Sequence, residues 1–215
     1  MSNSQYTPPS SLEGLTVEER KRLLDLARKA NLSRKTAESA RPIRLVSRDG
    51  KLPLSLAQQR LWFLSRLGTR DAAFHVSHAL RLKGELNRGA LCEALRGVVK
   101  RHEALRTRIV ELDGEAAQVV DAAERELGVK EYDLGSSGEG ELGAILEQET
   151  GAEFDLEQGP LMRAGLVALG DREHVLVVTM HHIVSDGWSV GILVREVGAL
   201  YAAFSAGAGD PLEPL

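Results

Sequence analysis

The segment MHHIVSDGWS (Met180–Ser189) holds the residues best suited to chemistry. His181 and His182 are adjacent, and three residues later an Asp-Gly pair follows, Asp186 and Gly187. An imidazole can accept, donate or relay a proton near neutral pH, and a nearby carboxylate can orient it or pin the loop that carries it. At average amino-acid usage this pattern occurs in roughly a few chains per ten thousand, so it indicates a site.

The elements on either side place this segment at the end of a buried strand. HVLVVTM (174–180) is almost entirely apolar, which is typical of a strand covered on both faces, and an amphipathic helix is predicted over 188–204. Ligands often bind where strands end and helices begin. Successive strand side chains point to opposite faces, so only one of the two histidines can face a given cavity while the other packs inside.

Less specific interpretations of these residues stay open. A histidine at a strand end is more often a satisfied core or surface residue, and Asp186 is a preferred N-cap for the following helix. No metal site is expected, because adjacent strand histidines point apart and Cys92 is the only cysteine. Gly187 is either a turn glycine or a position where only glycine lets the backbone approach a substrate.

Hydrophobic periodicity predicts a folded α/β lobe over residues 45–215, with helices layered on a mixed sheet. Helices are expected at 55–67, 87–102, 141–154 and 188–204, strands at 76–84 and 130–134, and hairpins at 107–120 and 162–180. In the first helix, four leucines recur at core spacing: Leu56, Leu61, Leu64 and Leu67. Residues 1–44 are predicted to be a disordered tether, a short helix near 16–30 and a linker.

Composition excludes several classes of function. The 215 residues are 43% hydrophobic and 27% charged with a net charge of −4, so neither nucleic acid nor an anionic membrane is an expected partner. No stretch approaches twenty uncharged apolar residues, so no membrane span is expected. The polar start MSNSQYTPPSSLEG does not resemble a signal peptide, and a cytoplasmic location is therefore expected.

MHHIVSDGWS resembles the third core motif, HHxxxDG, of condensation domains from nonribosomal peptide synthetases. LSLAQQRLWFL (Leu54–Leu64) resembles the first core motif, and RHEALRTRI (Arg101–Ile109) resembles the second, with Ile109 where phenylalanine is usual. FDLEQGPLMRA (Phe154–Ala164) is similar to the family's middle stretch. The likeness covers about residues 51–215, and the AQQRLWFL form is more similar to the subtype that takes an L-configured donor.

The resemblance implies a lobe like that of chloramphenicol acetyltransferase. It also implies amide formation between a donor acyl or peptidyl thioester and an acceptor aminoacyl thioester. Both substrates would be presented on the 4'-phosphopantetheine of carrier proteins, with no cofactor bound by this lobe. Motifs four to seven of the family do not follow Gly187. We therefore expect an N-terminal lobe that needs a C-terminal lobe as partner and is inactive alone.

The resemblance assigns the catalytic segment to His181, His182, Asp186 and Gly187, with His182 as the catalytic histidine. It implies that an arginine of the second motif supports Asp186 as an ion-pair partner, with Arg106 the first choice and Arg101 the second. Ser189 and Trp188 are candidate contacts to substrate or pantetheine. Trp188 is otherwise expected in the core, and Ser189 as a helix-start hydroxyl.

Two other functions fit the same residues. Several acyltransferase families with an oxygen nucleophile share HHxxxDG, and formation of an ester product would distinguish them. A non-catalytic module that docks carrier proteins is a different class. Intact catalytic motifs argue against it, whereas product formation that survives the loss of His182 would favour it.

Overall fold

The computed structural model describes residues 46–48, 51–67, 71–123, 127–135 and 139–215. The chain divides into two compact units, Met1–Ser47 and Arg48–Leu215, and the elements below belong to the second. The tether, helix and linker predicted for residues 1–44 lie outside the described residues.

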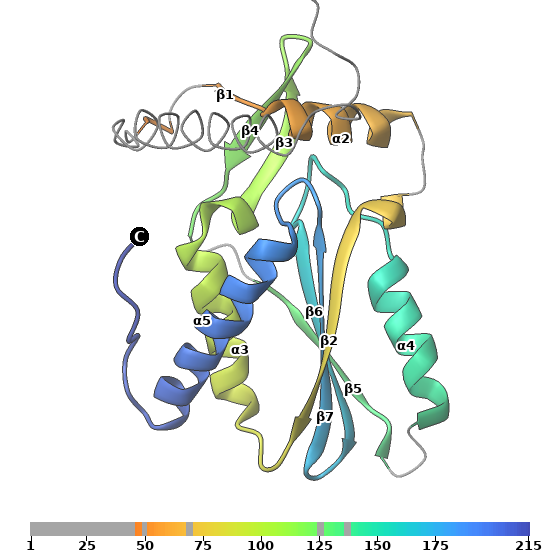
Figure 1. Ribbon diagram of the computed structural model, residues 1–215, viewed down its shortest axis with the longest axis vertical. Coiled ribbons are helices and arrows are strands. Elements are labelled where there is room, and N and C mark those ends of the chain that lie inside the picture. Colours follow the sequence, from red (N-terminus) through yellow and green to blue (C-terminus); the bar gives the residue numbers. More distant parts are fainter. Residues whose placement is uncertain (1–45, 49–50, 68–70, 124–126, 136–138) are drawn as a thin grey trace, which may run out of the picture. The chain divides into compact units, whose positions relative to one another are not determined.

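A four-stranded sheet carries the third core motif at the end of one of its two inner strands (Figure 1). Its order is β2 (His75–Lys83), β7 (Glu173–His181), β6 (Met162–Gly170) and β5 (Val129–Asp133). β2, β7 and β6 pair in antiparallel register, whereas β5 lies parallel to β6. Eight of the nine residues of β7 are buried, as expected for a strand covered on both faces.

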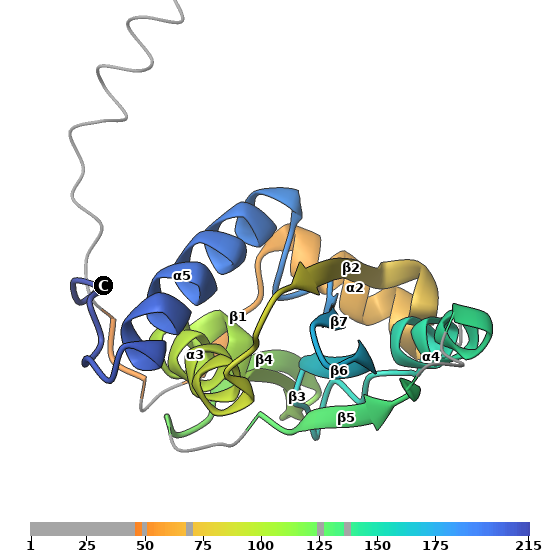
Figure 2. The ribbon, with the colours of Figure 1, turned by 90° about the horizontal axis from the view of Figure 1, so that it is seen from below.

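Helices cover the two faces of this sheet unequally (Figure 2). α3 (Arg88–Arg101) and α5 (Gly187–Ser205) pack on one face, and α4 (Glu139–Gly151) packs on the other. The main apolar core lies between the first face and the two helices. A Cβ added at Gly97 of α3 would lie 3.2 Å from Leu200 Cδ1 of α5, so this glycine allows the two helices to approach closely.

A second, three-stranded sheet has the order β1 (Leu52–Pro53), β4 (Glu115–Val120) and β3 (Thr107–Leu112). Asp113 and Gly114 join β3 to β4 with φ angles of 55° and 78°, as a two-residue hairpin of right-handed twist requires. α2 (Leu56–Arg66) follows β1, and the 3₁₀ helices η1 (Asp71–Phe74) and η2 (Glu103–Arg106) precede β2 and β3. A second apolar cluster joins these parts to the main sheet through Leu54, Ile109, Leu156, Leu161 and Ile183.

The layered α/β class is confirmed, but the core stripe predicted for α2 is wrong. α2 has no fully buried residue, and Leu56 and Leu67 are 85% and 62% exposed. Only one side of the helix, with Leu61 and Trp62, packs on the second cluster, so the outer leucines face away from it. Boundaries differ slightly: α4 begins at Glu139 and ends at Gly151, before the end predicted for it.

Candidate active site

His182 is held in one orientation by its own loop. β7 ends at His181, and the main-chain N–H of His182 donates to Phe74 O over 2.7 Å. The Nδ1 atom of His182 lies 2.6 Å from the carbonyl oxygen of Ser185. Because a carbonyl only accepts hydrogen bonds, Nδ1 carries the hydrogen, and Nε2 of the neutral ring carries the lone pair. The residue is exposed, so this nitrogen is presented on a surface-accessible ring.

His181 faces the opposite way and is completely buried. Its Nδ1 accepts a hydrogen bond of 3.0 Å from the main-chain N–H of Ile183, which fixes the start of the loop. Its ring also packs among three other aromatic rings with centroids 6.2–6.3 Å away, those of Phe74, His75 and Phe154. The prediction that one histidine packs inside is confirmed, and the strand alternation selects His182 as the accessible one.

Asp186 is the N-cap of α5, as one of the two interpretations of this residue predicts. Its carboxylate accepts from the main-chain N–H of Ser189 (2.9 Å) and from Ser189 Oγ (2.7 Å). The main-chain N–H of Asp186 donates to Ser189 Oγ over 3.3 Å, which completes a capping box. The hydroxyl and main-chain hydrogen bonds from Ser189 hold the pKa of Asp186 below its ordinary value. Ser189 is therefore confirmed as a helix-start hydroxyl.

The ion pair expected between Asp186 and Arg106 does not form, so that prediction is wrong. Asp186 is exposed, and Ser189 already occupies its carboxylate. Arg106, at the end of η2, donates to the main-chain oxygen of Asp121, and its Nη2 lies 3.8 Å from Glu103 Oε1. Asp186 is a short side chain directed to its own helix, whereas Arg106 is directed to the end of β4.

Arg101, the second choice for Asp186, also has a different partner. Its Nε lies 3.3 Å from Oε2 of Glu196 on α5, and Nε2 of His102 lies 2.6 Å from the same oxygen. Glu196 is only 7% exposed. The second core motif therefore contacts the helix that begins at Asp186, but it does so through Glu196.

The first core motif braces the active-site loop from the other side. The side-chain amide of Gln58 donates to the carbonyl of Ile183 over 3.2 Å and to Gln118 Oε1 over 3.3 Å. Ser55 caps α2 in a reciprocal box with the same Gln58. The sequence does not indicate this contact, because a bridge to a main-chain carbonyl 125 residues away leaves no local pattern.

The two remaining candidates differ from their predicted environments. Trp188 is 82% exposed, so its predicted place in the core is wrong: it lies in the first turn of α5 on the outer side. Gly187 is the first residue of α5 and does not have a positive φ, so it is a helical residue and not a turn glycine. Within the described part of the chain, a Cβ at Gly187 would meet nothing within 4 Å. Contacts from Gly187, Trp188 and Ser189 to a substrate remain predictions.

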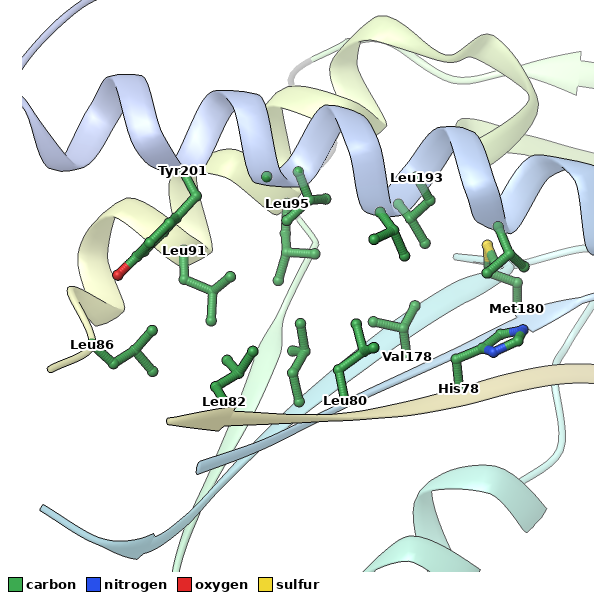
Figure 3. Close-up of a pocket in the computed structure, with 15 residues that line it drawn as sticks. His78, Leu80, Leu82, Leu86, Leu91, Leu95, Val178, Met180, Leu193 and Tyr201 are labelled. Atoms are coloured by element: carbon green, nitrogen blue, oxygen red, sulfur yellow. The ribbon is translucent and has the colours of Figure 1, made fainter. Parts of the chain in front are cut away.

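An apolar crevice starts beside this loop and runs beneath α5 (Figure 3). Its volume is about 230 Å³, and it lies between the helices α3 and α5 and the strands β2 and β7. His78 and Met180 lie at one end, and Leu86 and Tyr201 at the other (Figure 3). Met180, which lines this end of the crevice, directly precedes the two histidines in the sequence. No pattern in the sequence indicates this crevice.

Within the described ranges, no group of three or more His, Cys, Asp or Glu side chains is arranged to hold a metal ion. The same residues include no helix of the length and apolarity that crossing a bilayer requires.

An accessible histidine on a loop between a buried strand and a capped helix, in a layered α/β lobe, is an arrangement suited to acyl transfer. Residues 48–215 match the model of the condensation domain family. The chain belongs to this family, the condensation domains of nonribosomal peptide synthetases, and its lobe has the chloramphenicol acetyltransferase-like fold of that family.

Its relatives are much longer proteins. The chain is 49% identical over 172 residues to malpinin synthetase of Mortierella alpina, a match that covers 79% of the chain and 2% of the synthetase. It is 43% identical over 174 residues to malpibaldin synthetase of the same organism, a match that covers 79% of the chain and 3% of that synthetase. The chain therefore spans only a few per cent of the curated relatives that it matches.

Two solved structures are similar to this chain in both sequence and fold. The X-domain from teicoplanin biosynthesis is 36% identical with a TM-score of 0.73, covering 81% of this chain and 37% of the other. The first condensation domain of the calcium-dependent antibiotic synthetase, solved with a substrate analogue, is 25% identical with a TM-score of 0.68. That match covers 76% of this chain and 40% of the other.

Proposed function

We propose that this chain forms one lobe of a domain that joins two carrier-bound substrates through an amide bond. The donor is an acyl or peptidyl thioester and the acceptor is an aminoacyl thioester, each on the phosphopantetheine arm of a carrier protein. The observation that carries this proposal is the orientation of His182. Its Nδ1 is hydrogen-bonded to Ser185 O, which leaves Nε2 of this exposed residue free to accept a proton.

The chemistry requires one proton to be removed from the attacking amine. The amine nitrogen forms a bond to the thioester carbonyl carbon, the C–S bond breaks, and the released sulfur takes up a proton as a free thiol. Nε2 of His182 accepts the amine proton as the tetrahedral intermediate forms. Throughout this step the Nδ1–H group stays hydrogen-bonded to Ser185 O. Orientation and proton acceptance of this kind contribute about 10² to 10⁴ in rate.

Deprotonation of the amine in advance contributes much less. A free α-amine has a pKa of about 7.7–8.0, so roughly one molecule in eight is already neutral at pH 7. Complete deprotonation before attack would gain only about 1.2 kcal/mol. We therefore assign His182 to the forming intermediate. Stabilisation of the oxyanion is the competing role for the same side chain.

The reaction also requires a second wall around the substrates. Two pantetheine arms must bring the reacting atoms to about 3–3.5 Å, and His182 is exposed on this lobe. We propose that a C-terminal lobe of the same domain completes the site and that the carrier proteins deliver the substrates to it. The matches to the two solved structures described above cover only 37% and 40% of those solved chains, which supports this proposal.

The test uses the complete domain with both carriers loaded. An aminoacyl acceptor and the matching hydroxyacyl acceptor are compared, and the acceptor-carrier product is identified by mass spectrometry. The proposal predicts an amide product that requires His182. An ester formed in preference to the amide would instead establish an oxygen-nucleophile acyltransferase.

A second candidate is a recruiting module without catalysis. The X-domain has also been solved as a complex with OxyB from teicoplanin biosynthesis, and that chain is 34% identical to this one. The oriented imidazole of His182 favours catalysis. A complete wild-type domain that binds both loaded carriers but forms no amide above the uncatalysed rate would favour the recruiting module.

A further inference from the structure

Glu196 is a buried carboxylate on α5 that neither the N-cap nor the apolar core explains. It is 7% exposed, and its Oε2 accepts a hydrogen bond of 2.6 Å from Nε2 of His102. Nε of Arg101 lies 3.3 Å from the same oxygen. A carboxylate removed from water is costly unless it is paired, so the imidazole of His102 and the guanidinium of Arg101 restrict where Glu196 can lie.

The position of Glu196 along α5 connects it to the active-site loop. Ser189, Leu193, Glu196 and Leu200 follow one another at helical spacing on the side of α5 that faces α3. Ser189, His102 and Leu193 also line one cavity of about 100 Å³ between the two helices. The bond from His102 to Glu196 therefore adds a directional contact to the apolar packing of α5, two turns after the capping box.

Movement of the start of α5 would be transmitted directly to His182. Asp186 is the N-cap of α5, and Ser185, the residue before it, supplies the carbonyl that accepts from His182 Nδ1. That single bond, of 2.6 Å, selects the tautomer and aims Nε2. If α5 rotated or slid, this carbonyl would leave its place near the ring.

We propose that Glu196 is a positioning residue for His182, acting through α5. The second core motif, through His102 and Arg101, holds Glu196, and the helix transmits that position to Ser185 and the imidazole. The role in catalysis rests on the proposed function, but the effect on the His182 tautomer does not.

The tautomer gives a test that needs no turnover. The 215-residue chain is labelled with ¹⁵N-histidine and its ring nitrogens are observed at about pH 9, well above the ordinary histidine pKa of about 6.5. His182 is assigned by its loss in His182→Gln. Wild type should show the Nδ1–H form, whereas a free neutral histidine in water favours Nε2–H. In Glu196→Leu and in His102→Leu the Nε2–H form should become the majority.

Two further variants separate positioning from stability alone. Tyr201 also joins α5 to α3, because its hydroxyl accepts from the main-chain N–H of Asn87 over 3.2 Å, but it lies near the opposite end of α5. Tyr201→Phe should lower stability and keep the Nδ1–H form of His182. His102→Gln places an amide donor near the position of Nε2 and should restore the Nδ1–H form that His102→Leu loses.

Glu196→Gln keeps the size of the side chain and one acceptor oxygen, so it provides a folded variant if Glu196→Leu does not fold. A mixture of tautomers in Glu196→Gln supports the proposal. An unchanged Nδ1–H form in every folded Glu196 variant would overturn it, and so would an equal loss of that form in Tyr201→Phe. Failure to detect amide formation in the complete domain would count against the proposed function and leave this result standing.

Discussion

Nδ1 of His182 lies 2.6 Å from the main-chain oxygen of Ser185, three residues further along the same loop. The orientation of the accessible imidazole is therefore set by the backbone, and no carboxylate is needed as its partner. Asp186 acts one step further away, because it caps the helix whose start fixes the position of Ser185. This arrangement explains why the histidine pair and the aspartate occur together in one short segment.

The two histidines should differ in their effect on stability. His181→Ala removes a fully buried ring and leaves the buried N–H of Ile183 without its acceptor, so it should cost about 2–4 kcal/mol. His182→Ala removes an exposed side chain and should stay within about 0.5 kcal/mol of wild type. Denaturant unfolding of the 215-residue chain measures both, and equal losses would contradict the assignment of inner and outer histidine.

Asp186→Ala should behave as the loss of a helix cap. We expect the melting temperature to fall by roughly 2–4 °C, less than for His181→Ala. Asp186→Asn keeps an acceptor oxygen for Ser189 and should melt closer to wild type. The hydrogen bonds from Ser189 lower the pKa of Asp186, so the stabilisation should be present above the ordinary aspartate pKa of about 3.9 and lost as the pH falls through the lowered value. A loss of stability as large as that of His181→Ala would instead support the buried ion pair between Asp186 and Arg106.

A buried network on the other face of the sheet should make the chain sensitive to alkali. Burial and the hydrogen bond to Glu149 raise the pKa of Tyr132 to about 12. Burial also raises the pKa of Glu149, but hydrogen bonds from Tyr132 and Lys130 and the charges of Lys130 and Arg163 outweigh it and lower that pKa overall.

Because the pKa of Tyr132 is raised, its contribution to stability is present below the ordinary tyrosine pKa of about 10 and is lost as the pH rises toward 12. In that window the unfolding free energy of wild type should decline with pH. Tyr132→Phe should reduce the slope of this decline by an amount that corresponds to up to about one bound proton. Tyr201→Phe, which removes a phenol bonded to a main-chain N–H, should keep the decline. Identical pH profiles for wild type and Tyr132→Phe would contradict the network.

The 215-residue chain alone should not catalyse condensation. Holding two pantetheine arms in register contributes about 7–11 kcal/mol, whereas proton transfer by His182 contributes at most about 10⁴-fold, near 5 kcal/mol. The larger contribution requires a second wall, and His182 is exposed on this lobe. Loaded carriers incubated with this chain should give no dipeptidyl product. Turnover at the rate of the complete domain would show that the second lobe is dispensable.

Local periodicity predicted most of the elements and that only one of the two histidines would be accessible, whereas the choice of His182 came from the resemblance to the family. The continuous apolar run of β7 and the N-cap at Asp186 are short-range patterns that the structure reproduces. Long-range contacts were not predictable in this way. Arg106 and Glu196 carry no local sign of their partners, so the pairing of the second core motif with Asp186 rested on the resemblance alone, and Glu196 was missed.

The sequence also failed to predict which apolar residues on helices would be exposed. Leu56 and Trp188 are large apolar side chains, and hydrophobicity alone places such residues in a core. In the structure both lie in the first turn of a helix, on the side away from the packed cluster. The apolar crevice was also missed, since it exists only where β2, β7, α3 and α5 meet.

The most direct test of the account is the single-turnover rate of amide formation by the complete domain carrying His182→Ala. With both carriers loaded, we predict a rate about 10² to 10⁴ lower than wild type, with folding and carrier binding unchanged. Arg195→Ala, an exposed change on α5, serves as the control and should retain the wild-type rate. A wild-type rate for folded His182→Ala would contradict the assignment of proton transfer to the exposed Nε2 of His182.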